Sequence, residues 1–231
     1  MSRRPARKNP VMAYAGTLCT LLALLDSTAL ANPRPPRDGW QTVAAGAHHD
    51  VAALYAPDAV WIRIRGHVDV AIDTTCRVLS DVEGYAAWFP GLIESREISD
   101  TPGAPLIYGR IDAPWPVRDR DYVSLQRWQS LPGAIELETR AAPEDRVPES
   151  ATLPDDTVRL PRMLSRWRLR PDDEGTQIEY VVREPGARNW LQDLLVERTA
   201  ALAEALLANL EQTARETANA RPHAPCAAHP R

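Results

Sequence analysis

The feature that most constrains the fold is a series of alternating segments that ends in one long helix. Residues 189–217 are rich in Ala and Leu and contain no Gly or Pro, which predicts a helix of about 43 Å. The preceding strands are connected by short links such as Leu131-Pro132-Gly133, which implies an antiparallel sheet. The sequence therefore predicts an α+β fold in which one curved sheet wraps around the C-terminal helix. The strands are expected at residues 92–99, 105–112, 120–129, 134–142, 158–170 and 176–184.

The segment before this series predicts a mixture of short elements. Residues 39–45 are expected to form a short helix, and residues 50–56 a strand. Residues 62–70 alternate between apolar and polar side chains, which is typical of a half-buried strand. A further helix is expected to begin at Asp73, since Asp is a favourable N-cap.

Three strands show which of their sides faces the core. Ile135 and Leu137 alternate with glutamates, while Trp167 and Leu169 alternate with arginines, and Ile178, Tyr180 and Val182 continue the pattern. The polar sides therefore place opposite charges on neighbouring strands, where each pair contributes about 0.2–1 kcal/mol. The arginine row at 162–170 can be interpreted as a basic docking patch or as half of a solvated, paired face. The opposing glutamates favour the paired face.

The first 31 residues have the pattern of a secretory signal peptide. Four basic residues lie between positions 3 and 8, and Val11–Leu25 is an apolar run of 15 residues. Ala29-Leu30-Ala31 supplies small residues for cleavage. The run is shorter than the roughly 20 residues that span a membrane, so an uncleaved anchor is only the alternative. We expect cleavage after Ala31 and a periplasmic or secreted mature protein.

The rest of the chain is expected to hold one domain. We predict a linker at residues 32–39, the domain at 40–217 and a disordered tail at 218–231. Cys76 and Cys226 remain after cleavage and can form a bridge in an oxidising compartment. His223, Cys226 and His229 have a ligand-like spacing, but Pro residues interrupt this tail, and no metal site is expected there.

The charge of the mature chain limits its partners. The 27 basic residues less the four in the leader leave 23, and the 31 acidic residues less Asp26 leave 30, so the formal charge is −7. This acidity argues against nucleic acid, or an anionic membrane, as the main binding partner. About 200 residues suffice for a single domain that buries most of its apolar surface. We expect a monomer.

Three segments together resemble those of a known family. Ala113–Val123 leads from a Pro-bounded loop through an Arg-Asp repeat into a strand, and Val158–Pro171 and Arg183–Leu195 follow in order. These segments are similar to bacterial START (StAR-related lipid-transfer) domains, over about Trp40 to Glu216. The resemblance implies a helix-grip fold with a lipid-sized cavity between sheet and helix. It also implies binding and transfer of one lipid or other hydrophobic molecule, with transient membrane contact.

The resemblance also assigns roles to individual residues. Trp115 is the tip of the loop Ala113–Asp119, where it either gates the cavity or covers a small satellite core. Arg120 and Asp121 form a structural motif that ties this loop to its strand. Gln126 occupies a position that is basic in some sterol-binding members, so a buried ion pair is not expected there. The ligand contacts expected from the resemblance and the alternation are Trp115, Tyr122, Ser124, Gln126, Trp128, Met163, Trp167, Tyr180, Trp190, Leu191 and Leu194.

The predicted inner face shows no obvious chemistry. It carries no evident carboxylate pair and no His, so no catalytic residue, metal or cofactor is expected. An apolar inner face is ordinarily a solid core, but seven Trp against one Phe, together with the resemblance, favour a cavity. One alternative is a polyketide aromatase/cyclase-like enzyme on the same plan. Another is a cavity-free adaptor that binds an envelope protein through a Trp-rich rim.

Overall fold

The computed structural model describes residues 33–99, 105–113, 117–149, 151 and 157–218. Ten strands of this part form one sheet, in the order β1-β2-β3-β10-β9-β7-β6-β5-β4, with β8 beside β6. The neighbours along this order are antiparallel, and only the short β8 runs parallel to β6. The strands are β1 Gln41–Ala45, β2 His49–Ala56, β3 Ala59–Val68, β4 Leu92–Ser99, β5 Leu106–Ile111, β6 Arg120–Leu131, β7 Ala134–Ala141, β8 Val158–Arg159, β9 Leu164–Pro171 and β10 Thr176–Pro185.

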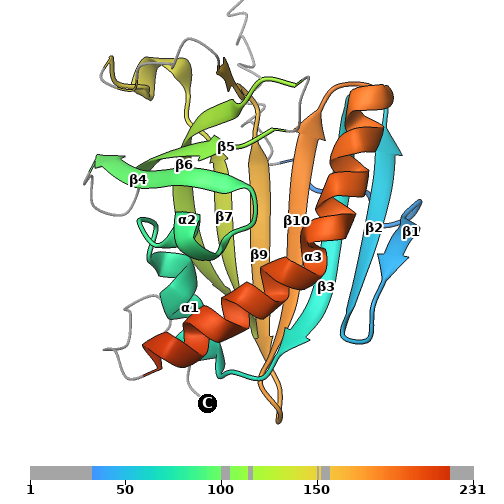
Figure 1. The fold of residues 1–231 in the computed structure, drawn as a ribbon, viewed down its shortest axis with the longest axis vertical. Coiled ribbons are helices and arrows are strands. Elements are labelled where there is room, and N and C mark those ends of the chain that lie inside the picture. The colour runs from blue at the N-terminus through green and yellow to red at the C-terminus, as the bar shows by residue number, and fades with distance from the viewer. Residues whose placement is uncertain (1–32, 100–104, 114–116, 150, 152–156, 219–231) are drawn as a thin grey trace, which may run out of the picture. The chain divides into compact units, whose positions relative to one another are not determined.

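One long helix lies across the concave side of this sheet (Figure 1). It is α3 (Trp190–Thr217), and the Asn189 side chain caps it by accepting hydrogen bonds from the amides of Leu191 and Gln192. The shorter α1 (Ile72–Ser80) and α2 (Tyr85–Trp88) lie beside its C-terminal half. The α+β fold with a curved sheet around a C-terminal helix is therefore confirmed. Among the described helices, none is both long and apolar enough to cross a membrane.

Three local predictions were wrong. Asp73 is not the N-cap of α1, which begins at Ile72 after the N-cap Ala71. Residues 41–45 form β1 where a helix was expected, and they pair with β2 through a register shift between Thr42 and Ala44. The pairing satisfies backbone groups that a five-residue helix leaves open. The strand expected at 158–170 is divided into β8 and β9, because Pro161 between them has no amide to donate to the ladder.

The main core fills the space between sheet and helices. Ile135, Leu137 and Leu169 from the sheet pack with Leu206 and Leu210 from α3. Cys76 on α1 is also fully buried in this core and is disulfide-bonded. Since Cys19 and Cys226 both lie outside the described residues, the pairing with Cys226 stays a prediction, as do the leader, its cleavage site and the tail.

The convex face of the sheet carries the predicted pairs of opposite charge. Glu136 lies opposite Arg168, whose Nη2 is 2.6 Å from the carboxylate, and Arg168 also contacts Glu179 at 3.6 Å. Glu138 pairs with Arg166 at 2.9 Å. These pairs are less solvated than expected, since Glu136 is only 1% exposed and Arg166 8%. Arg166 and Arg168 of the arginine row are therefore engaged within the sheet, whereas Arg162 and Arg170 are exposed.

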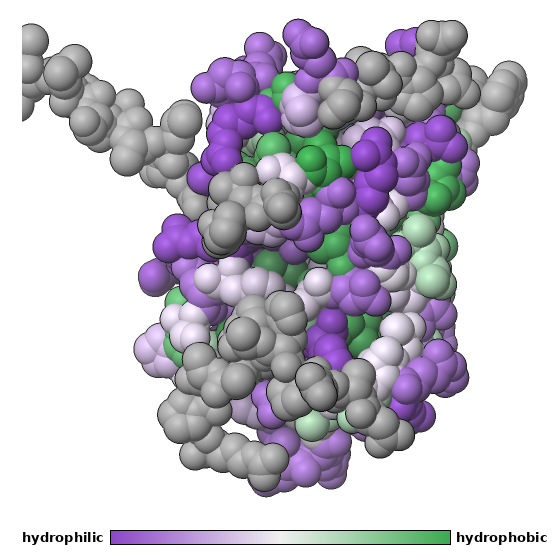
Figure 2. All heavy atoms as spheres, turned by 90° about the vertical axis from the view of Figure 1, so that its left-hand side faces the viewer, coloured by the Kyte–Doolittle hydropathy of each residue, from purple (hydrophilic) through white to green (hydrophobic). Residues whose placement is uncertain are grey.

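A second apolar layer covers part of the convex face. Val123 and Leu125 on β6 pack there against Ala151 from the β7–β8 connection. Both faces of β6 are therefore buried, which explains why its sequence shows no clear alternation. Figure 2 shows the side of the molecule next to β4, where hydrophilic residues cover most of the visible surface and apolar residues appear in the gaps.

Candidate functional site

A cavity of about 330 Å³ lies between the concave face of the sheet and the N-terminal half of α3. The sheet contributes the inner sides of β5, β6, β9 and β10, and the α2–β4 connection and the loop after β5 close the rim. Most of the lining is apolar. It includes Ile64, Leu92, Ile107, Ile111, Leu160, Val182, Leu191, Leu194, Leu195, Leu202 and Leu206.

Three aromatic rings form a rigid part of the cavity wall. Trp167 and Tyr180 are directly opposite on β9 and β10, and their rings stack at 4.3 Å. Phe89 packs edge-on against both, at 6.3 and 6.0 Å. Such contacts fix the rings in defined orientations. The wall thus presents flat apolar surfaces to whatever occupies the cavity.

Tyr122 reaches the cavity floor because the neighbouring strand leaves room for it. Its partner across β5 is Gly109, where an added Cβ would lie 2.3 Å from the tyrosine ring. Beside it, Gln126 donates to the Tyr85 hydroxyl at 3.3 Å. Burial raises the pKa of Tyr85, Tyr122 and Tyr180, so these hydroxyls stay protonated and neutral at neutral pH.

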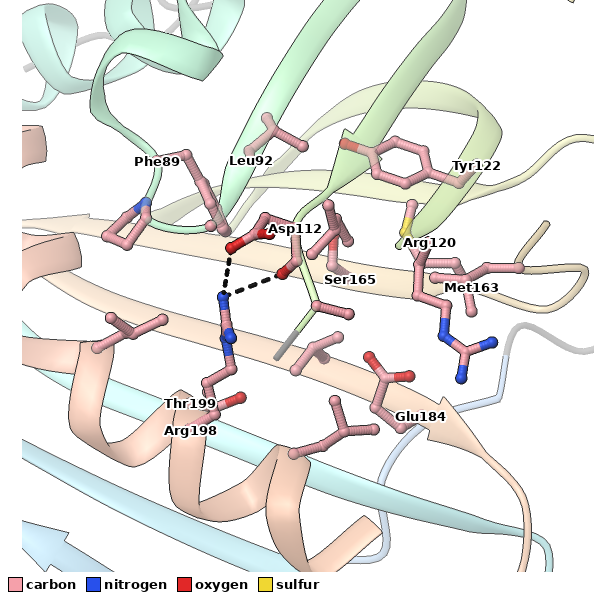
Figure 3. Close-up of a pocket in the computed structure, with 18 of the residues that line it drawn as sticks. Phe89, Leu92, Asp112, Arg120, Tyr122, Met163, Ser165, Glu184, Arg198 and Thr199 are labelled. Carbon is pink, nitrogen blue, oxygen red and sulfur yellow. Dashed lines mark hydrogen bonds and ion pairs between the residues drawn. The ribbon is translucent and has the colours of Figure 1, made fainter. Parts of the chain in front are cut away.

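One end of the cavity is charged. Arg120 at the start of β6 and Glu184 near the end of β10 both line it, and Figure 3 shows their charged groups at the same end. Desolvation raises the pKa of the Glu184 carboxyl to about 7, although the positive charges of Arg120 and Arg183 oppose the shift. Within the described residues, neither Arg120 nor Glu184 forms an ion pair at 4.0 Å or less.

The other end is closed by contacts between α3 and the loop after β5. Arg198 on α3 donates to the backbone carbonyl of Asp112 at 3.0 Å and lies 3.4 Å from its carboxylate (Figure 3). The Asp112 amide donates to the Gly91 carbonyl at 2.8 Å, and the Ala113 amide to the Asp119 carboxylate at 3.1 Å. The Arg198–Asp112 pair is partly exposed, and such pairs contribute about 0–1 kcal/mol. This pair by itself therefore contributes little to holding the loop against α3.

The structure brings most of the predicted ligand contacts together. Seven of them line the cavity, namely Tyr122, Gln126, Met163, Trp167, Tyr180, Leu191 and Leu194. Ser124 is fully buried but turns its hydroxyl to the Ile107 carbonyl. Trp128 packs against the edge of the main core, away from the cavity. Trp115 lies outside the described residues, so its role as a gate stays a prediction.

Trp190 was wrongly placed among the cavity residues. Its side chain is 66% exposed, whereas Leu191 and Leu194 face the cavity. Helical side chains point back toward the N-terminus. The first residue of α3 therefore projects beyond the helix end, and Trp190 forms an exposed apolar group near the cavity.

Arg120 and Asp121 were predicted to form one structural motif that ties the loop to its strand. In the structure their side chains have different surroundings. Asp121 is 0% exposed and makes two hydrogen bonds of 2.8 and 2.7 Å to Arg159 on β8. Arg120 lies on the opposite side of the strand and lines the cavity, because consecutive residues of a strand alternate between its faces. Asp121 is thus the structural half of the motif, and it anchors β8 to β6.

The sequence reasoning missed Glu184, which is an acid on the inner face. The alternation along the strand indicated its position. Glu184 is two residues after Val182 and so lies on the same side of the strand as Ile178, Tyr180 and Val182. It was overlooked because the strand was expected to end there. In the described residues, no group of three or more His, Cys, Asp or Glu side chains could hold a metal ion, and His223, Cys226 and His229 lie outside them.

Comparison with known proteins agrees with this architecture. No family model matches the chain. An uncharacterized protein of Pseudomonas aeruginosa is 29% identical over 139 residues, which span 57% of this chain and 66%, just under two thirds, of that relative. A STAR-related lipid transfer protein from Xanthomonas axonopodis superposes with a TM-score of 0.64 at 26% identity, over 77% of this chain and 99% of that one.

Two human structures share the fold at lower identity. STARD10 has a TM-score of 0.61 at 20% identity, covering 77% of this chain and 74% of its own. StAR-related lipid transfer protein 5 has a TM-score of 0.59 at 14% identity, covering 80% and 91%. The shared features are the antiparallel sheet and the long C-terminal helix. This chain has the START helix-grip fold.

Proposed function

We propose that the protein binds one hydrophobic molecule non-covalently in its cavity and carries or presents it within the cell envelope. The observation that carries this proposal is the apolar cavity of about 330 Å³ under α3. Pockets of about 300–1,000 Å³ with few polar groups are typical of small-molecule sites. Each methylene group that leaves water contributes about 0.8 kcal/mol to binding.

The volume restricts the size of the ligand. A cavity of about 330 Å³ lies at the low end of the range for small-molecule pockets, which is about 300–1,000 Å³. This size favours a single apolar chain or a compact ring system. The flat wall of Trp167 and Tyr180 suits either. A two-chain lipid requires the cavity to expand.

Exchange of the ligand requires the loop after β5 and the start of α3 to separate. The Arg198–Asp112 contact joins this loop to the ninth residue of α3 and is weak enough to break during exchange. Trp190 is exposed at the first turn of the same helix. Since Trp partitions favourably into the membrane interface, we propose that Trp190 makes the transient membrane contact. Together with the leader-like residues 1–31, this supports action at an envelope membrane.

The first test is native mass spectrometry of the mature monomer, purified without detergent and followed by organic extraction. A stoichiometric hydrophobic adduct is expected. The variant Leu195→Trp fills the cavity and should lose the adduct, whereas Ala201→Trp places the same side chain on the exposed side of α3 and should keep it. A wild-type protein that stays bare after incubation with mixed envelope lipids would refute the proposal.

The alternative of an aromatase/cyclase-like enzyme now has one observation in its favour. Glu184 is a carboxyl in the cavity with a pKa raised to about 7, as a general acid or base requires. Chemical conversion of an added polyketide-type substrate, abolished by Glu184→Gln, would establish the enzyme. The cavity in the described interior argues against the cavity-free adaptor.

A further inference from the structure

The charged end of the cavity contains groups that lack partners. Arg120 and Glu184 line the same end without an ion pair in the described part of the chain. Gln192 on α3 lies there as well and is 6% exposed. Its Nε2 donates to the Pro185 carbonyl at 3.5 Å, while its Oε1 is buried without a hydrogen-bond partner in the described structure. The unpaired charges of Arg120 and Glu184 suit a polar ligand group at this end. The Gln192 Oε1 is an acceptor and calls for a donor, which a carboxylate does not supply.

The other charges near Glu184 are engaged elsewhere. Arg183, the preceding residue on β10, pairs with Asp58 at 2.6 Å. Arg198 on α3 is occupied by Asp112 at the far end of the cavity (Figure 3). Among the described residues that line this end, Arg120 is the cation that forms no ion pair.

The remaining neighbours of Glu184 are neutral. The Tyr180 hydroxyl on the same strand stays protonated, because burial raises its pKa. Gln192 on α3, and Leu160 and Met163 from the segment before β9, line the same cavity and are uncharged. Among the described residues that line this end, Arg120 and Glu184 are therefore the two charged groups that no ion pair balances.

We propose that the ligand is a single-chain carboxylic acid, held with its carboxylate between Arg120 and a protonated Glu184 and its chain along the apolar wall. This inference rests on the proposed function and names the class of ligand. The Arg120 guanidinium donates to the carboxylate, and the Glu184 O–H donates to its other oxygen. Hydrogen bonds in which the donor or the acceptor is ionised, as in both of these, are short and strong.

The charge balance explains why a proton accompanies the ligand. Without ligand, Arg120 and ionised Glu184 sum to zero. A bound carboxylate adds one negative charge in a region of low dielectric, where an uncompensated charge is costly. Uptake of one proton by Glu184 restores neutrality, because one guanidinium then faces two carboxyl groups that share one proton. No covalent bond of the ligand forms or breaks.

The consequence is that binding of the acid weakens as the pH rises. Glu184 has a pKa of about 7 in the free protein, so the protonated fraction falls tenfold per pH unit above that value. Between about pH 6 and pH 8.5 this linkage raises the apparent Kd for a carboxylic acid roughly 30-fold. An uncharged alcohol of the same chain length needs no proton, and its Kd should stay constant.

The experiment compares dodecanoate with dodecanol, titrated calorimetrically into the mature protein at both pH values. Wild-type protein should show the pH-dependent Kd for dodecanoate only, and should take up about one proton per dodecanoate at pH 8.5 in buffers of different ionisation enthalpy. Glu184→Gln keeps a hydrogen-bond donor, so it should bind dodecanoate with little pH dependence. Arg120→Gln should weaken dodecanoate at least tenfold and leave dodecanol unchanged. The dodecanol titration also reports whether each variant is folded.

The outcomes separate the two proposals. If dodecanoate and dodecanol bind with the same affinity at both pH values, the carboxylate site is wrong and the hydrophobic cavity stands. If the pH dependence survives in Glu184→Gln, Glu184 is not the group that takes up the proton. If neither compound binds to wild-type protein, and the native mass spectrum is also bare, both the carboxylate site and the proposed function are overturned.

Discussion

Replacing Glu184 by Gln is expected to stabilise the unliganded protein at alkaline pH. Burial raises the pKa of this carboxyl from 4.5 to about 7, and one pKa unit corresponds to about 1.4 kcal/mol, so ionisation costs the folded state at most about 3 kcal/mol. The residue as a whole is only half-buried. Solvent screening therefore reduces the expected gain from the substitution to about 1–2 kcal/mol.

The direction of the pH dependence follows from proton binding. The folded state binds the Glu184 proton more tightly than the unfolded chain, so this residue lowers the stability of wild-type protein as the pH rises from about 4.5 to about 7. Gln resembles the protonated carboxyl and does not titrate. The stability difference between variant and wild type should therefore be near zero at about pH 4.5, grow to about pH 7 and remain constant above it.

Urea unfolding followed by tryptophan fluorescence measures this difference at acid, neutral and alkaline pH. Glu204→Gln is the matched control, since Glu204 is an exposed acid on α3 that does not line the cavity. A gain of the same size at every pH would show that the effect is not due to ionisation. A variant no more stable than wild type at alkaline pH would show that Glu184 is adequately solvated, and the argument from burial would be wrong.

The remaining predictions concern the anchor of β8, the exposed tryptophan and the disulfide. Asp121→Asn removes the charge that binds Arg159 and should lower the free energy of unfolding by about 3 kcal/mol. A loss below about 1 kcal/mol in urea titrations would contradict the structural role of Asp121. Trp190→Ala should slow ligand transfer between vesicles several-fold without changing the Kd, whereas Trp190→Phe should retain most of the rate. Peptide mapping of exported protein under non-reducing conditions should find Cys76 linked to Cys226, and two free thiols would exclude that pairing.

Much of the sheet could be predicted because its signals are local. The expected strand at 92–99 coincides with β4, and that at 176–184 differs from β10 by one residue. Alternation works there because one face is packed and the other is covered with charge. It failed at 41–45, where pairing with β2 decides the conformation and the five-residue segment carries no periodic signal.

The candidate site was predictable only in part. Tyr122 and Gln126 could be assigned to the inner face, but Ser124 shares that face and still does not reach the cavity. Trp190 was assigned to the cavity because helical spacing does not show how the first turn is rotated against the sheet. Such errors arise where the answer depends on contacts between different elements, as for the Ser124 hydroxyl and the Ile107 carbonyl.

The sequence by itself determined the α+β class, the antiparallel order of short-linked strands, the long C-terminal helix and the charged convex face. These features follow from side-chain periodicity and from the absence of Gly and Pro in residues 189–217. Only the tertiary structure decided that the apolar interior leaves a cavity, that Asp121 pairs with Arg159, and that Glu184 faces Arg120 without binding it. The reason is physical: a void, an ion pair and a shifted pKa each depend on distances between elements remote in the chain, which the local pattern of residues does not contain.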